Sequence, residues 1–388
     1  MSDPPRVPLR TIASQWGRIG ILGFGGPPAH ISMLRALCVE RRGWLSAEEF
    51  ADGVAATNLL PGPASTQLAI FCAWRLAGVP GAVVGGLSFI CPGLAIIIAL
   101  AAALLGHHPP IGVLGAAAGA GAAVPAVALA AALGLLPASW ARAGSRRSAR
   151  VRWVTYVTLG AGAAATVGAY LVLVIAACGA AEVLARRAPG PPGIARRPGL
   201  ALAPLPVVAA GGLAALAWVA FKVGALSYGG GFVIIPMMQH DAVSVYHWMT
   251  PGQFLDAVAL GQLTPGPVVQ TVAVVGFAAS GVGGALLAAA IAFAPSFAFV
   301  LALGPRFDRL RESAAVQSFL TGAGATAIGA IAGASIPLGL ALEQWWQVGV
   351  LAGAAIWMLV LRRGTVTCLL AAGALGALAA AAGAPLTR

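Results

Sequence analysis

Long apolar stretches separated by short clusters of arginine are the feature that most constrains the fold of this chain. Of its 388 residues, 59% are hydrophobic and only 9% are charged, and the mean hydropathy is +0.90. A soluble domain is about 25% charged. Because a bilayer admits only backbones that satisfy their own hydrogen bonds, the sequence predicts an all-α polytopic membrane protein.

The net charge of +12 does not indicate nucleic-acid binding. Nearly all the arginines lie in short clusters between apolar stretches, as in the cytoplasmic loops of membrane proteins. We therefore expect the lipid bilayer and a small ligand as partners, and no nucleic acid. A homodimer is left open.

The chain contains two halves that are related by a constant shift of 204 residues. Adding 204 carries Trp44 onto Trp248 and Phe50 onto Phe254, and it carries a Pro-Gly-Pro motif at 61–63 onto another at 265–267. A basic, proline-rich stretch separates the two halves. The sequence therefore predicts an N-terminal half at 1–185, a linker at 186–204 and a C-terminal half at 205–388.

Each half is predicted to contain one helical hairpin that enters the membrane and returns, because its helices are too short to span about 30 Å. These hairpins lie at 46–60 with 64–77, and at 251–263 with 268–280. The other apolar or amphipathic segments lie at 10–26, 29–41, 80–105, 111–137, 153–185 (divisible near Gly168), 205–226, 232–247, 282–304, 314–339, 345–361 and 364–384.

Loop charges indicate that the two halves have opposite orientations. The first half has arginines at 35–42 and 142–152, whereas the corresponding loops of the second half hold no Lys or Arg. The reverse holds for the uncharged loop 106–110, whose counterpart is basic. Because basic loops face the cytoplasm, we expect an inverted topology of about ten spans plus the two re-entrant hairpins. The C-terminus is then outside, and the side of the N-terminus is left open.

Each Pro-Gly-Pro motif breaks a helix, because proline cannot donate a backbone hydrogen bond and glycine adopts unusual dihedrals. Inverted hairpins bring the two breaks together near the midplane, where the next helix begins with free amide groups and a positive dipole end. Such an end is suited to an anion. Alternatively, these polar residues only cap helices in a packed bundle. The expected site residues are Asn58, Pro61, Gly62, Pro63, Ser65, Thr66, Gln67, Gln262, Thr264, Pro265, Gly266, Pro267, Gln270 and Thr271.

Two pairs of charged residues also correspond between the halves. Arg18 and Lys222 are candidate cations for a dianion, because a charge inside the bilayer usually marks a pathway. The alternative is that they snorkel to the interface. Asp52 and Asp256 are candidate coupling groups, or acids that complement a helix dipole at the membrane surface.

Glycines that follow an aromatic residue end the first segment of each half. They are Phe24, Gly25 and Gly26 in the first half and Tyr228, Gly229 and Gly230 in the second. Glycine permits unwound backbone next to a ligand, so these residues are further binding candidates. The alternative is packing of helices through small residues.

Catalytic signatures are missing from the sequence. It has no GxxxxGK[ST] motif, no nucleophile–base arrangement and no supporting ligands for its histidines. We therefore expect no enzyme activity, no cofactor, no metal and no ATP hydrolysis by this chain.

Four motifs resemble those of the chromate ion transporter (CHR) family, long-chain bidomain type. They are Phe24-Gly-Gly-Pro-Pro-Ala-His30, Leu60-Pro-Gly-Pro63 with Gln67, Tyr228-Gly-Gly-Gly-Phe232 and Thr264-Pro-Gly-Pro267. The resemblance covers essentially the whole chain. It implies movement of chromate across the bacterial inner membrane, usually efflux linked to the proton motive force, with chromate resistance as the phenotype and sulfate as a mimic. One departure is Gly231-Phe232, where the first half has Pro27-Pro28, so the two sides of the site are not equivalent.

Two other functions stay open at this point. One is an oxyanion-selective channel on the same scaffold. Persistent flux at channel rates that does not depend on a coupling gradient would indicate it. The other is a membrane oxyanion reductase, although the sequence offers no haem, flavin or metal ligands for it.

Overall fold

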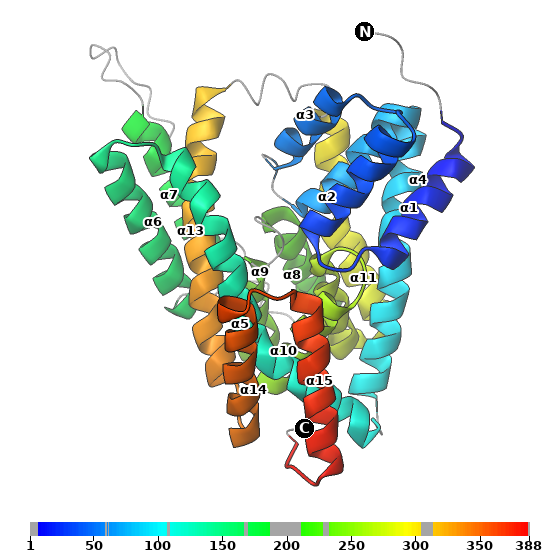
Figure 1. Cartoon of the computed structure of the whole chain (residues 1–388), viewed down its shortest axis with the longest axis vertical. Coiled ribbons are helices and arrows are strands. Elements are labelled where there is room, and N and C mark those ends of the chain that lie inside the picture. Colours follow the sequence, from blue (N-terminus) through cyan, green and yellow to red (C-terminus); the bar gives the residue numbers. More distant parts are fainter. Residues whose placement is uncertain are drawn as a thin grey trace.

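The protein is built from helices, and its described part holds no strand (Figure 1). The computed structural model describes residues 7–58, 60, 62–106, 109–166, 170–186, 211–227, 233–303 and 313–386. The first half contains α1 (Leu9–Leu22), α2 (Pro27–Arg35), η1 (Ala36–Arg41), α3 (Ala47–Thr57), α4 (Ala64–Leu105), α5 (Ile111–Ala143), α6 (Arg147–Thr166) and α7 (Leu171–Arg186). The second contains α8 (Leu213–Leu226), α9 (Ile234–Gln239), η3 (His240–Val245), α10 (Pro251–Leu263), η4 (Val268–Gln270), α11 (Thr271–Leu303), α13 (Ala314–Leu340), α14 (Trp345–Ala355), η6 (Ile356–Val360) and α15 (Thr365–Ala381).

The helix before each Pro-Gly-Pro motif begins with the same reciprocal cap. Ser46 accepts a hydrogen bond from the backbone of Glu49, whose side chain bonds back to the backbone of Ser46. Thr250 and Gln253, 204 residues later, form the same pair of bonds. A capping box satisfies two free amide groups and fixes where a helix starts. The repeat is therefore present in local structure as well as in sequence.

The helix after each Pro-Gly-Pro motif is bent at a glycine. In α4 the bend lies at Ala77 and Gly78, with φ of 63° at the glycine. In α11 it lies at Ser280 and Gly281, with φ of 58°. Positive φ is accessible to glycine without steric cost. Each bend ends the half-helix that the sequence predicts, and a long apolar helix follows it.

Four helices in the described part of the chain, α4, α5, α11 and α13, are long and apolar enough to cross a membrane. Together with the apolar composition, they support a multi-pass membrane protein. Other apolar helices are shorter: α15 has 17 residues and rises about 26 Å at 1.5 Å per residue. That length falls short of a bilayer core of about 30 Å. The count of about ten spans therefore stays a prediction.

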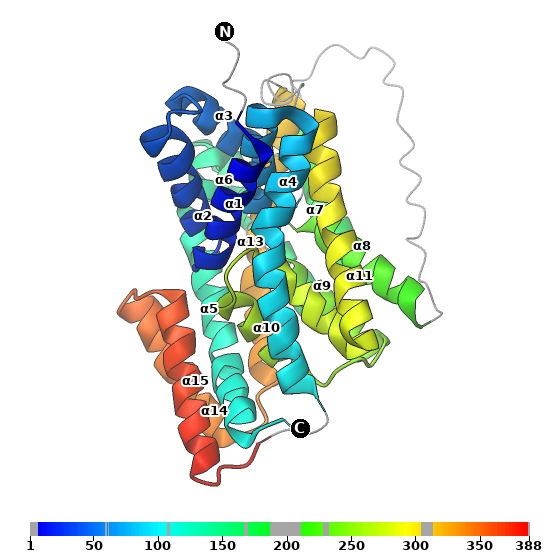
Figure 2. The same ribbon diagram turned by 90° about the vertical axis from the view of Figure 1, so that its right-hand side faces the viewer.

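The last two helices of each half pack against a long helix of the other half. In Figures 1 and 2, α14 and α15 lie beside α5, whereas α6 and α7 lie beside α13. Glycines allow these close approaches: a Cβ on Gly119 would lie 2.2 Å from the backbone oxygen of Ala372, and one on Gly329 would lie 1.9 Å from that of Val157. Small residues permit such packing between helices in a membrane.

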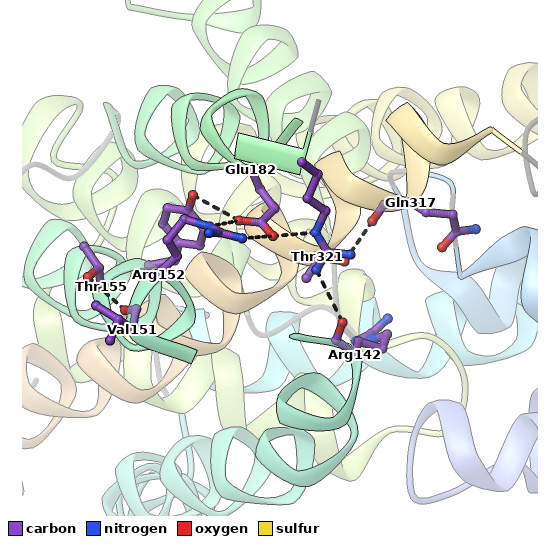
Figure 3. Close-up of polar contacts among 9 residues, drawn as sticks. Arg142, Val151, Arg152, Thr155, Glu182, Gln317 and Thr321 are labelled. Atoms are coloured by element: carbon purple, nitrogen blue, oxygen red, sulfur yellow. Dashed lines mark hydrogen bonds and ion pairs between the residues drawn. The ribbon is translucent and has the colours of Figure 1, made fainter. Parts of the chain in front are cut away.

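A buried carboxylate ties α6 to α7 (Figure 3). Glu182 accepts hydrogen bonds from Arg152 at 2.7 and 3.1 Å and from Arg186 at 2.5 Å. Arg186 also reaches the backbone oxygen of Arg142 at 3.5 Å. Two guanidinium groups therefore compensate one carboxylate, so these arginines serve packing of the helix pair. The predicted linker begins at Arg186, and its remaining residues lie outside the described part.

Candidate functional site

Both Pro-Gly-Pro motifs interrupt helices as the sequence predicts. The first lies between the end of α3 and the start of α4, and the second lies between α10 and the short η4 that precedes α11. The central glycines have positive φ, 127° at Gly62 and 104° at Gly266, a region where other residues are strained. Pro63 and Pro267 then precede the first residue of the following helix in extended conformation. Pro61 lies outside the described residues.

Reciprocal hydrogen bonds join each break to the other half of the protein. The N–H of Gly62 donates to the oxygen of Ser227 at 2.9 Å, and the N–H of Gly266 donates to the oxygen of Gly23 at 3.1 Å. The shift of 204 residues carries each of these bonds onto the other. Both breaks therefore lie against the end of the first helix of the opposite half, and residues beside both breaks line one cavity.

The glycines after α1 lie at this meeting point. Gly26 faces the second break, where its missing Cβ would lie 3.9 Å from Val268. Gly25 and Gly26 both line a cavity with the first break, whereas Phe24 is exposed. Their predicted counterparts Tyr228, Gly229 and Gly230 lie outside the described residues.

Polar side chains at the start of the helices that follow the breaks are buried. This set comprises Ser65, Thr66, Gln67, Gln270 and Thr271. Gln270 donates its side-chain amide to the backbone oxygen of Ile90 at 2.9 Å, and Thr271 donates its hydroxyl to that of Val268 at 2.8 Å. Thr264, just before the second break, bonds to Leu260 at 2.9 Å. Part of the predicted polar set is thus used to hold the breaks in place.

Other polar atoms around the breaks have no hydrogen-bond partner among the described residues. They are the hydroxyl oxygens of Thr66, Ser227 and Ser296, the side-chain nitrogen of Gln262 and the side-chain oxygen of Gln270. Buried polar atoms are nearly always paired with protein or water. Five unpaired atoms around one structural feature indicate a site for water or for a polar ligand.

Two residues that no sequence pattern indicated face the breaks from the long helices. A Cβ on Gly93 of α4 would lie 2.0 Å from the backbone oxygen of Pro265. A Cβ on Gly62 would lie 3.4 Å from the hydroxyl of Ser296 on α11. Gly93 and Ser296 correspond at a shift of 203, because the second half is one residue shorter between its break and its bend. A search that allowed this gap could have found them.

A cavity of about 570 Å³ opens between the first break, the α1–α2 connection and α5. Five of the predicted site residues line it: Gly25, Gly26, Asn58, Gly62 and Gln262. Two further lining residues, Arg362 and Arg363, belong to the connection between η6 and α15 and were not singled out from the sequence.

The two predicted cations lie away from the cavity and in different surroundings. Lys222 is 6% exposed, and its ammonium lies 2.5 Å from the carboxylate of Asp241 on η3. Arg18 is exposed on α1. Neither residue lines the cavity. Asp241 corresponds to Leu37 in the first half, so a comparison of the halves gave no signal for this ion pair.

The two predicted acids are both half-buried. Asp256 lies on α10 against α5, where a Cβ on Gly121 would lie 2.7 Å from its carboxylate oxygen. Within the described part of the chain, the Asp256 carboxylate has no hydrogen bond or ion pair. A carboxylate inside an apolar helix bundle without a counterion is a candidate for proton binding. Asp52 occupies the corresponding place on α3.

The family model for chromate transporters matches residues 10–183 and 214–377, which together span most of the chain. The chain belongs to the chromate transporter family. This result confirms the resemblance that the sequence motifs indicated. It also agrees with a protein that is not an enzyme, because the family is one of transporters.

Individual chromate transporters are similar along most of their length. The chromate transport protein of Cupriavidus metallidurans is 33% identical over 345 residues, covering 86% of this chain and 83% of that protein. The chromate transport protein of Pseudomonas aeruginosa is 31% identical over 352 residues, covering 86% and 82%. A probable chromate transport protein of Synechococcus elongatus is 30% identical over 345 residues, covering 86% of each chain. No solved structure shows a significant match.

Candidate metal ligands do not gather in the described part of this transporter. There, no group of three or more His, Cys, Asp or Glu side chains is placed to hold a metal ion. His107 and His108 lie outside the described residues.

Proposed function

We propose that this protein is a secondary transporter that moves chromate, or a related tetrahedral oxyanion such as sulfate, across the bacterial inner membrane. The direction is efflux, linked to the proton motive force. The observation that carries the proposal is the cluster of five unpaired polar atoms where the two breaks meet. Membership of the family, whose relatives are named chromate transport proteins, supports chromate as the anion.

The chemistry of the unpaired atoms suits an oxyanion. Thr66, Ser227 and Ser296 each offer a hydroxyl donor, and the amide of Gln262 offers two. The helix that follows Pro63 has no side-chain cap, so its first amide groups add donors and a positive dipole end. The free oxygen of Gln270 is an acceptor, so it suits a hydroxyl or a water molecule. A tetrahedral dianion has four acceptor oxygens, so it matches hydroxyl, side-chain amide and backbone amide donors in kind.

The proposed scaffold has two halves in inverted topology, with the basic loops in the cytoplasm. The reciprocal bonds of Gly62 and Gly266 and the exchange of terminal helix pairs support a two-fold relation between the halves. The opposite charges of corresponding loops support their inversion. The division at 186–204 is supported by the two separate family matches. An inverted repeat gives one site that two equivalent arrangements can open to opposite sides of the membrane.

Asp256 is the proposed coupling group. Its carboxylate lies on the helix that leads into the second break, so protonation there changes the charge of an element that joins the proposed site. The half-buried Asp52 is the corresponding group in the first half.

Uptake of labelled chromate into inverted membrane vesicles tests the function. Vesicles that contain the protein should accumulate chromate against its gradient when a proton gradient is imposed, and sulfate and molybdate should compete more strongly than chloride. Asp256→Asn should abolish uphill uptake while the amount of folded protein stays unchanged. Uptake equal to that of vesicles without the protein would contradict transport. Chromate flux at channel rates that needs no proton gradient would show a channel and not a transporter.

A further inference from the structure

Two adjacent arginines lie at the tip of a helical hairpin that reaches the cavity beside the breaks. The hairpin consists of α14 with η6 and α15, and Arg362 and Arg363 lie in the connection between them. In Figures 1 and 2 this connection lies well inside the length of the molecule, level with the α1–α2 connection. The cavity confirms that proximity, because both arginines line it together with Gly25 and Gly26.

The charges of Arg362 and Arg363 are not compensated. No Asp or Glu lines the cavity, and within the described residues neither guanidinium has a hydrogen bond or an ion pair. The charge of Lys222, in contrast, is compensated by Asp241. A guanidinium group carries five donors in a planar arrangement and binds two oxygens of an oxyanion at once. The two arginines therefore supply the full positive charges that the helix ends at the breaks, with only partial dipole charge, lack.

The residue type at Arg362 is unusual for its backbone conformation. Its φ is 51°, and the next residue, Arg363, donates its N–H to the oxygen of Trp357 at 3.1 Å. Glycine is the usual residue just past a helix end with this left-handed conformation. A long cationic side chain thus occupies a position where the backbone favours glycine. Replacing it by glycine removes the charge without disturbing the fold.

We infer that Arg362 and Arg363 are the residues that select divalent oxyanions at this cavity. They attract the dianion and hold it beside the first break and the side chain of Gln262, which line the same cavity. This inference rests on the proposed transport function and names the cations of its site. Because two positive charges face one cavity, a dianion is favoured over chloride or another monovalent anion.

The test is chromate uptake by inverted vesicles that contain Arg362→Gln, Arg363→Gln or the double variant. Each single change should raise the KM for chromate about 10-fold, the usual cost of losing one hydrogen bond to a charged group. The double variant should also lose the preference for sulfate over chloride as a competitor, and its KM should depend less on ionic strength. Arg362→Lys and Arg363→Lys keep the charge and should recover part of the affinity.

The matched control is Arg41→Gln with Arg42→Gln, another adjacent pair of exposed arginines at a helix end that does not line the cavity. This variant should keep the wild-type KM. Arg362→Gly should lower chromate affinity like Arg362→Gln, with a melting temperature equal to or above that of the wild type.

The outcomes separate the two proposals. If wild-type vesicles take up no chromate, the proposed function fails. If the wild type transports and the double Arg362 and Arg363 variant keeps its KM and its anion preference, the inference about the arginines is overturned while the function stands. Equal loss in the control pair would show a general surface-charge effect and would likewise overturn it.

Discussion

Alanine in place of Gly93 is expected to abolish chromate uptake. A Cβ at this position would lie 2.0 Å from the backbone oxygen of Pro265 and 2.7 Å from the side-chain oxygen of Gln270. The first of these atoms belongs to the backbone, so no change of rotamer can relieve the clash. We expect α4 and the second break to separate, at a cost near the upper end of the overpacking range, about 3 kcal/mol. Vesicle uptake and the melting temperature of the purified protein measure the two effects.

Gly162→Ala is the control for this experiment. Nothing lies within 4 Å of a Cβ at Gly162, which is inside α6. Alanine there should leave uptake unchanged and stabilise the helix by about 0.5–1 kcal/mol. Normal uptake by Gly93→Ala protein would mean that the second break does not need its close contact with α4.

Asparagine in place of Asp241 is expected to destabilise the protein strongly. Lys222 and Asp241 are both buried, and their ammonium and carboxylate groups are 2.5 Å apart. Removing one partner of a buried pair leaves an uncompensated charge and costs about 3–5 kcal/mol. A lower yield of folded protein in detergent and a lower melting temperature should follow.

The double variant Lys222→Met with Asp241→Leu shows whether this loss comes from the charge. Replacing both partners by apolar residues is often neutral for stability, so the melting temperature should return to near that of the wild type. Chromate uptake should return with it, because Lys222 does not line the cavity. A double variant that folds but does not transport would place the ion pair in the transport mechanism.

The breaks could be predicted from sequence because they depend on local chemistry. Two prolines and a glycine interrupt a helix whatever surrounds them, and the shift of 204 residues identified the second motif as the counterpart of the first. The bends at Gly78 and Gly281 also fall where the half-helices were expected to end. Local backbone preferences are thus enough to place these breaks and bends.

The charged residues could not be assigned in the same way. Arg18 and Lys222 correspond in sequence, yet one is exposed and the other is paired with an acid that has no counterpart in the first half. Arg362 and Arg363 reach the cavity only because the hairpin of α14 and α15 packs on α5 of the other half. Contacts between segments this far apart depend on tertiary packing, and no local pattern encodes them.

Binding of labelled chromate to the purified protein most directly tests whether the two breaks form an oxyanion site. Equilibrium dialysis should show saturable binding of one chromate per chain, displaced by sulfate. Thr66→Val and Ser296→Ala each remove one unpaired hydroxyl at a break and should each weaken binding about 10-fold. Saturable binding that is unchanged in the variant carrying both substitutions, or no saturable binding by the folded wild type, would contradict a site at the breaks.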